Sequence, residues 1–179
     1  MKELTQERLK ELLDYDPDTG LFVWKVRRSG MAEAGSVAGN TNSTDYRRIS
    51  CDYNSYLSHR LAFLFMEGSF PPALVDHINH DKADNRWANL RHVTKVENNR
   101  HNAMQTNNIS GVTGVCWHKQ NKKWRAFIHP DGKAIHLGST SDKDEAIRWR
   151  KAAEVKYGFS PYHGQPKEAF ARLDISDVT

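Results

Sequence analysis

Residues 75–102 of the chain, VDHINHDKADNRWANLRHVTKVENNRHN, are dense in histidine, aspartate and asparagine. Carboxylate and amide oxygens are hard ligands for divalent cations such as Mg²⁺, and a neutral imidazole can accept a proton from water near pH 7. The same residue types also build polar surface, turns and helix caps. Composition alone therefore leaves two interpretations of this segment, a metal-assisted site and a solvated loop.

The elements around these residues predict how the side chains come together. A short apolar run at 74–75 ends at Asp76 and His77, and a polar loop follows. Residues 90–94 have the character of a second strand, and 95–104 that of a helix. The pattern predicts a ββα unit.

Three asparagines take defined places in this unit. Asn89 opens the second strand, Asn98 falls within the first helical turns, and Asn102 follows four residues later on the same helix face. A strand pair packed on a helix would gather a carboxylate, an imidazole and amide oxygens over one small surface.

This order of residues resembles the HNH nuclease family. Asp76 and His77, then Asn89, then Asn98 follow the form found in phage homing endonucleases, where asparagine replaces the last histidine. The flanking stretches HRLAF, DNRWANLRHVT and YDPDTGLFVW are similar to the same group. The resemblance covers most of residues 5–104.

The resemblance implies a role for each residue in hydrolysing a DNA phosphodiester. His77 would act as general base on the attacking water. Asp76 and Asn98 would hold a divalent ion, Mg²⁺ first and Mn²⁺ as the alternative. Asn89 would hold the hairpin and orient His77. Two accessory candidates follow on the helix. His101 could contact phosphate or be a solvated histidine, and Asn102 could assist the ion or the phosphate.

Two arginines near the motif have two equal interpretations. Arg86 and Arg91 could clamp phosphate or could simply be charged surface.

Bulk properties agree with an anionic partner without requiring one. The 179 residues carry 26 Lys and Arg against 22 Asp and Glu, a net charge of +4. The two cysteines, Cys51 and Cys116, have no CxxC spacing, so we expect neither a disulfide framework nor structural zinc. No signal peptide or membrane-length apolar run is evident, which predicts a cytoplasmic protein, in the host cell if it is phage-encoded.

The N-terminal part has clear local signals. Leucines at helical spacing follow Thr5, a plausible N-cap, and the DPDTG turn precedes a strand at 21–24. Residues 29–45 have the composition of a loop with one short strand. A hairpin around 47–57 leads into a helix at 59–68.

Beyond a polar linker, the chain changes character. Three strands are predicted at about 112–118, 123–129 and 133–138, with turn signals between them. A helix beginning near Asp142 and ending at Gly158 follows. Its expected inner stripe is Ala146, Trp149, Ala153 and Tyr157. A short helix at 166–173 completes the tail.

The stretches GVTGVCW, KWRAFI and HLGSTSDKDEA resemble the AP2 domain over residues 110–158. In that family a three-stranded sheet lies in the DNA major groove and the helix packs on its back. The resemblance implies that five residues face DNA: His118, Arg125, Phe127, His129 and His136. Three lysines could reach phosphates: Lys119, Lys123 and Lys133. Five residues would face the helix: Trp124, Ala126, Ile128, Ile135 and Leu137. The alternative is a basic face that is merely solvated.

The sequence therefore predicts an α+β protein of two modules. The first is an HNH domain at 1–104, with a ββα-metal core at about 73–104. A linker at 105–110 precedes an AP2-like three-stranded antiparallel sheet packed on one helix at 111–158. A C-terminal tail occupies 159–179.

The predicted function is that of a metal-dependent DNA endonuclease acting on double-stranded DNA as a monomer that nicks one strand. One alternative is a DNA-binding regulator with a degenerate nuclease centre, which the complete set of Asp76, His77, Asn89 and Asn98 argues against. A structural RNA-binding protein is a third, and would prefer backbones with 2′-hydroxyls.

Overall fold

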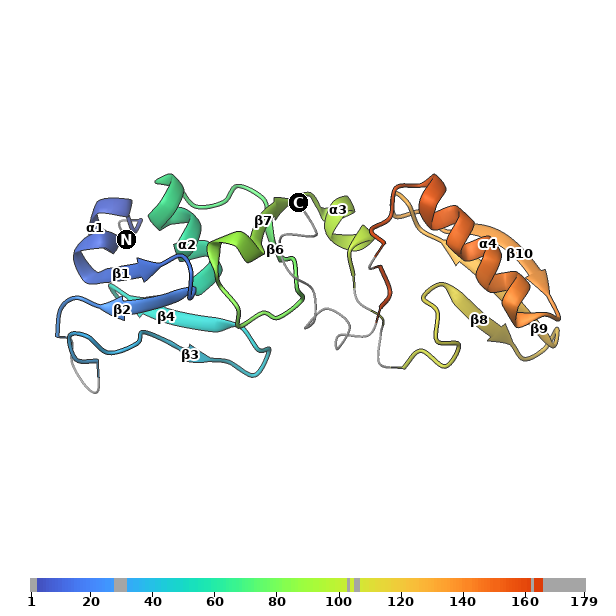
Figure 1. Ribbon diagram of the computed structural model, residues 1–179, viewed down its shortest axis with the longest axis horizontal. Helices are drawn as coiled ribbons and strands as arrows, with labels where there is room; N and C mark the ends of the chain where they lie inside the picture. Colours follow the sequence, from blue (N-terminus) through green and yellow to red (C-terminus); the bar gives the residue numbers. More distant parts are fainter. Residues whose placement is uncertain (1–2, 28–31, 103, 105–106, 162, 166–179) are drawn as a thin grey trace. The chain divides into compact units, whose positions relative to one another are not determined.

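The computed structural model describes residues 3–27, 32–102, 104, 107–161 and 163–165. These residues divide into two compact units, and the division falls between Val93 and Thr94 (Figure 1). The predicted helix at 166–173 lies outside the described residues. In the part of the chain that is described, no helix is long and apolar enough to cross a bilayer.

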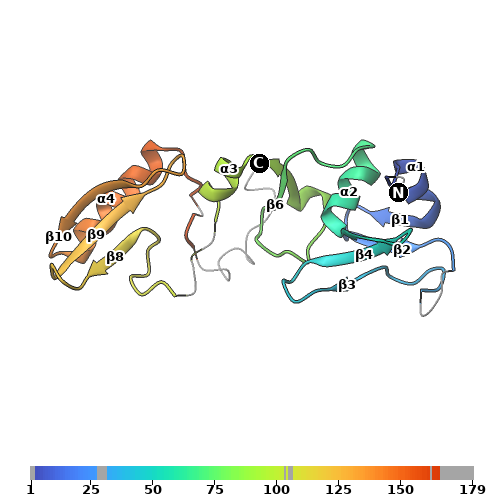
Figure 2. The same cartoon turned by 180° about the vertical axis from the view of Figure 1, so that it is seen from behind.

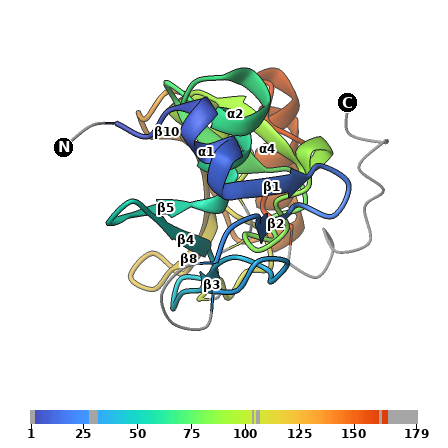
Figure 3. The same cartoon turned by 90° about the vertical axis from the view of Figure 1, so that its left-hand side faces the viewer.

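Two helices of the first unit begin and end where local signals place them. Helix α1 (Gln6–Leu12) is capped by Thr5, whose hydroxyl accepts a hydrogen bond from Arg8 N at 3.2 Å, as predicted. Helix α2 (Ser58–Glu67) ends at Gly68, which takes the left-handed conformation with φ 83°. Figure 3 shows the two helices side by side.

The strands of the first unit form three small antiparallel sheets. The first pairs β1 (Leu13–Asp16) with β2 (Leu21–Trp24), the second has the order β3 (Asn40–Thr41), β4 (Arg47–Cys51), β5 (Asn54–Leu57), and the third pairs β6 (Leu74–His77) with β7 (Leu90–Val93). Apolar side chains from α1, α2, β1, β2 and β4 close into one core. Leu9, Phe22 and Phe63 are among its fully buried members.

The turn between β1 and β2 is pressed against the loop that precedes β7. Gly20 has φ 71°, and a Cβ built there would lie 2.3 Å from the backbone of both Asn85 and Arg86. Only glycine fits this close approach. Trp87 N also donates a hydrogen bond to Pro17 O at 2.9 Å. The N-terminal hairpin thus fixes one side of that loop.

The second unit contains the predicted three-stranded sheet and its helix. The strands β8 (Val115–His118), β9 (Lys123–Ile128) and β10 (Ile135–Thr140) are antiparallel, with β9 in the centre. Helix α4 (Lys143–Lys156) begins after Asp142, whose side chain accepts from Asp144 N at 2.9 Å, as predicted. In Figure 2 the strands lie in front of α4, so the helix packs on one face of the sheet.

The inner face of α4 differs from the predicted stripe. Ala146 and Ala153 are buried as expected, but Arg150 and Glu154 are buried with them, at 2% and 6% exposure. Arg150 Nε pairs with Glu154 Oε1 at 2.9 Å, and its Nη1 donates to Phe127 O at 2.7 Å. The buried charges are therefore tolerated because each is paired within the unit.

Helix α3 (Lys95–Arg100) is shorter than the predicted 95–104. A capping box between Thr94 and Glu97 starts it, and His101 is its C-cap. The expected placement of Asn102 on the same helix face as Asn98 is therefore wrong, because Asn102 follows the end of the helix.

Candidate active site

The β6–β7 hairpin places Asp76 and His77 on opposite faces. Asp76 pairs with Arg91 and His77 with Leu90 in the strand register, and consecutive side chains of a strand alternate. Both side chains lie at the end of β6 and are buried, with residue exposures of 9% for Asp76 and 4% for His77. The predicted carboxylate and imidazole therefore neighbour each other along the chain but have different surroundings.

The His77 ring lies in a cluster of three rings. His59, in the first turn of α2, stands edge-on to His77 with the centroids 5.1 Å apart and the planes at 84°. Tyr46 lies 6.0 Å from His77 and 5.4 Å from His59. Neither neighbour can be singled out from the sequence, because both reach His77 only through tertiary packing.

Burial keeps the two histidines neutral. It lowers the pKa of His77, although hydrogen bonding by Asn85 and the charge of Asp76 act in the opposite direction. Burial, with repulsion from His77 and Arg60, lowers the pKa of His59 to about 3. A neutral imidazole can accept a proton, so His77 has the protonation state that a base needs near pH 7.

Asp76 is neutralised by Arg91. Its Oδ2 accepts hydrogen bonds from Arg91 Nε at 3.0 Å and from Arg91 Nη2 at 2.7 Å. A carboxylate suits Mg²⁺ by its hard oxygen donors, so the chemistry of Asp76 fits the predicted ion. Arg91 is consequently the group that a cation at Asp76 would have to compete with.

The second predicted ligand, Asn98, is half-buried in α3 and belongs to the second unit. Its amide oxygen is also a donor that Mg²⁺ accepts. Within the described residues, no cluster of three or more His, Cys, Asp or Glu side chains could hold a metal. The pairing of Asp76 with Asn98 stays a prediction, as do the accessory roles of His101 and Asn102.

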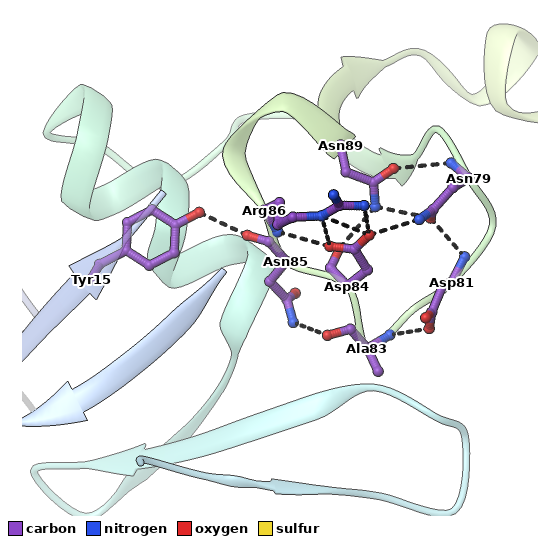
Figure 4. Close-up of polar contacts among 8 residues, drawn as sticks. All are labelled: Tyr15, Asn79, Asp81, Ala83, Asp84, Asn85, Arg86 and Asn89. Atoms are coloured by element: carbon purple, nitrogen blue, oxygen red, sulfur yellow. Dashed lines mark hydrogen bonds and ion pairs between the residues drawn. The ribbon is translucent and has the colours of Figure 1, made fainter. Parts of the chain in front are cut away.

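A dense polar network holds the loop at 78–89 (Figure 4). Asn89 is fully buried, and its Oδ1 accepts from Asn79 N at 3.0 Å. Its Nδ2 donates to Asn79 Oδ1 at 2.9 Å and to Asp84 O at 2.8 Å. Asn89 therefore braces the loop that follows His77, and its side-chain bonds go to that loop rather than to the imidazole.

Arg86 is part of the same network. Its Nη2 lies 2.6 Å from Asp84 Oδ2 and its Nε 2.9 Å from Asp84 Oδ1. Burial disfavours the charged form of Asp84, but hydrogen bonds from Arg86 and from Asn79 outweigh it, so the pKa of Asp84 is lowered. Arg86 thus stabilises the loop through Asp84, and its two interpretations stay predictions.

Asn85, at the centre of the loop, is almost completely buried at 1% exposure. Its Nδ2 donates to Ala83 O at 2.8 Å, and its carbonyl oxygen accepts from the Tyr15 hydroxyl at 2.7 Å. Burial raises the pKa of Tyr15, so this hydroxyl keeps its proton. Ala83 thus holds the side chain of Asn85, and Tyr15 holds its backbone.

In the second unit, the strand register brings the predicted DNA-facing residues of the sheet onto one face. Lys123 pairs with His118, and Phe127 with His136. Arg125, between them on β9, pairs with Cys116 on one side and Ser139 on the other. The exposed members of the predicted set are Lys119, Lys123, His129, Lys133 and His136, and the half-buried ones are His118, Arg125 and Phe127.

Comparison with known proteins identifies the region around His77. Residues 56–100 match the family model described as HNH endonuclease. The chain carries an HNH endonuclease domain. The matched range of this HNH domain contains Asp76, His77, Asn89 and Asn98.

Two further proteins are similar to this chain. Protein 3.8 of Escherichia phage T7 is 29% identical over 75 residues, which are 42% of this chain and 61% of the phage protein. The match thus spans about three fifths of that relative. A solved structure of DNA binding and cleavage by the HNH homing endonuclease I-HmuI is 25% identical, with a TM-score of 0.38, and the match covers 85% of this chain and 87% of that one.

Proposed function

We propose that the protein is a metal-dependent DNA endonuclease in which His77 is the general base. The observation that carries this proposal is the buried, neutral His77 at the end of β6, inside the HNH domain and next to Asp76. Neutral histidine near pH 7 is the form that can take a proton from an attacking water.

The burial of the His77 imidazole determines which ring nitrogen can accept a proton from water. Nε2 of His77 is shut off from solvent and has no hydrogen-bond partner among the described residues. A water molecule can therefore approach only Nδ1. Nδ1 accepts the proton when Nε2 carries the hydrogen of the neutral ring.

Asp76 and Asn98 would hold the divalent cation, Mg²⁺ before Mn²⁺. When bound, such a cation neutralises charge on the phosphate and stabilises the leaving 3′ oxygen. When no cation is bound, Arg91 balances the charge of Asp76 through its two hydrogen bonds to Oδ2. With the cation in place, Arg91 would become available for a phosphate oxygen, which is the first of its two interpretations.

The sheet of the second unit would be the DNA reader, in the manner of an AP2 domain. Its face bears the exposed lysines and histidines listed above, beside Arg125 and Phe127. A reader tethered to a weakly binding nuclease raises the local concentration of the nuclease at its target. A single HNH centre per chain suggests a monomer that nicks one strand, and the similarity to a phage protein suggests a phage setting.

The test is incubation with supercoiled plasmid. We expect conversion to open circles with Mg²⁺, slower or comparable conversion with Mn²⁺, and none in excess EDTA. His77→Ala should be inactive, whereas His92→Ala, which alters an exposed histidine of the same hairpin, should cut like the parent. Cutting in excess EDTA would contradict the metal, and DNA binding without any cutting would favour the regulator with a degenerate centre.

A further inference from the structure

His77 and Asn85 each have one buried polar atom without a hydrogen-bond partner among the described residues. One is Nε2 of His77, and the other is Oδ1 of Asn85. An unpaired buried polar atom destabilises the folded state, so these two atoms need an explanation. An amide oxygen can only accept a hydrogen bond, and an imidazole nitrogen that carries hydrogen can only donate one. The two atoms are therefore complementary.

The two side chains already influence each other. Hydrogen bonding by the Asn85 side chain raises the pKa of His77, against the larger effect of burial. An acceptor beside the ring has this effect because it favours the form with more N–H donors.

We propose that Asn85 is the positioning residue for His77, a role that rests on the endonuclease function proposed above. Asn85 Oδ1 accepts the hydrogen of His77 Nε2, which fixes the neutral tautomer with its lone pair on Nδ1. The same bond stabilises the imidazolium formed when Nδ1 takes a proton. An oriented base of this kind, held by a third group, recurs in hydrolases, and asparagine fills the third place in Cys-His-Asn proteases.

The surroundings of Asn85 determine which way its amide points. Because Nδ2 donates to Ala83 O, the oxygen must lie on the other side of the amide. The Tyr15 hydroxyl and the close approach of Gly20 hold the backbone of the same residue. The acceptor is thus preorganised by the N-terminal hairpin rather than by the strands of the HNH domain.

Ring packing supplies the other half of the positioning. Rotation about χ2 of histidine is broad, so an imidazole needs neighbours to hold its plane. His59 at 5.1 Å and Tyr46 at 6.0 Å restrict the His77 ring. Both are chemically quiet near pH 7, because burial lowers the pKa of His59 to about 3 and raises that of Tyr46. The rings set the plane of His77, and Asn85 sets its tautomer.

The test compares Asn85→Leu with Asn85→Asp in the full chain. Both changes remove the Nδ2 donor to Ala83 O, but only aspartate keeps an acceptor toward His77. We expect Asn85→Leu to lower the single-turnover cleavage rate at saturating DNA by roughly 10- to 100-fold, with DNA affinity unchanged. Asn85→Asp should stay within about 5-fold of the parent, with the acidic limb of its pH–rate profile moved to higher pH.

A spectroscopic measurement separates orientation from stability. Imidazole ¹⁵N chemical shifts of His77 should report the Nε2–H tautomer in the parent and in Asn85→Asp, and a mixture of tautomers in Asn85→Leu. Thermal unfolding of each variant measures its loss of stability separately from the tautomer signal.

Parental cleavage by Asn85→Leu would overturn the proposal, as would equal losses in both variants with an unchanged tautomer signal. These outcomes are distinct from failure of the endonuclease function itself. If His77→Ala is inactive while Asn85→Leu cuts normally, only the positioning role of Asn85 is contradicted. If His77→Ala cuts normally, the role of His77 as general base and the positioning role of Asn85 are both contradicted.

Discussion

The loop at 78–89 and the open face of the β8–β10 sheet use polar side chains in opposite ways. In the loop, asparagines and charged residues bond to one another and to the backbone, and Asn85 and Asn89 are buried. On the sheet face, Lys123 and Arg125 make no ion pair with any residue of the described chain.

This difference separates two tasks. A group that must act on a reacting atom is most effective when its geometry is fixed before the substrate arrives, and a buried network achieves that. A group that meets a long anionic partner gains more by staying unpaired until contact, because its charge then replaces released counterions. The loop should therefore matter for folding and turnover, and the sheet face for binding.

The largest expected effect is on turnover, from His77→Ala. Removing the proposed general base should lower the cleavage rate by roughly 10²- to 10⁴-fold. DNA affinity should stay within about 2-fold, since one neutral side chain adds little to the phosphate contacts that dominate affinity. Single-turnover rates and gel-shift titrations measure the two quantities. A parallel loss of affinity would break the separation of tasks.

The next effect is on stability, from Asn89→Ala. Three hydrogen bonds disappear, and the half-buried Asn79 and Asp84 groups lose their partner, so the free energy of unfolding should fall by about 2–3 kcal/mol. Urea denaturation measures this change. Asn121→Ala, an exposed asparagine in the turn between β8 and β9, is the matched control and should change stability by less than about 0.5 kcal/mol. Equal losses would erase the contrast between loop and sheet.

Arg125→Ala should have the opposite result to Asn89→Ala, a loss of DNA binding with stability preserved. Because Arg125 forms no ion pair in the described chain, its removal should change stability by under about 0.5 kcal/mol, yet weaken DNA binding by about 1–3 kcal/mol if it reads a guanine edge. Competition between duplexes of different sequence tests this. A loss that is uniform across sequences would make Arg125 a phosphate contact instead. Arg148→Ala, an exposed change on α4, should leave binding unaltered.

The most gradual effect is a dependence of the free energy of unfolding on pH. His59 and His163 are buried, and burial lowers their pKa values to about 3 and about 4. Between these values and the ordinary histidine pKa near 6.5, the unfolded chain binds more protons than the folded one. Stability should therefore rise with pH across this window and fall on acidification, by roughly 1 kcal/mol per pH unit for each histidine.

Urea denaturation at several pH values between 5 and 7 would show this slope. His59→Phe should flatten it for the first unit, and His163→Phe for the second. An unchanged slope in His59→Phe would mean that this ring is not held neutral by burial.

Local signals carried much of the fold. The N-caps at Thr5 and Asp142 were predicted because a side-chain oxygen in that position satisfies a helix terminus whatever surrounds it. The helix predicted at 59–68 is α2 at Ser58–Glu67, since an apolar run before a glycine leaves few other outcomes. Helix α3 is shorter than predicted, because the polar run after Arg100 has no apolar face to extend it.

The surroundings of the site could not be predicted in the same way. The ring of Tyr46 meets His77 across 31 positions of sequence, and the Tyr15 hydroxyl meets Asn85 across 70. No spacing rule encodes such contacts. Likewise, Arg150 and Glu154 match a solvent-exposed i, i+4 pair in sequence, and only the packing of α4 on the sheet buries them. The motif itself was visible because its order is local, while the roles of Asp76, His77 and Asn98 stay predictions.

The contact of Gly20 with the backbone of Asn85 and Arg86 bears on protein engineering. The stretch that matches the HNH family begins at residue 56, so a fragment limited to this stretch contains every residue of the motif. Such a fragment would lack the glycine turn, Pro17 and Tyr15, and with them the clamp on the loop after His77. A fragment of this protein for use in another must therefore include the first hairpin. A graft of residues 56–100 alone would carry Asp76, His77 and Asn98 without the hairpin that holds the loop after His77.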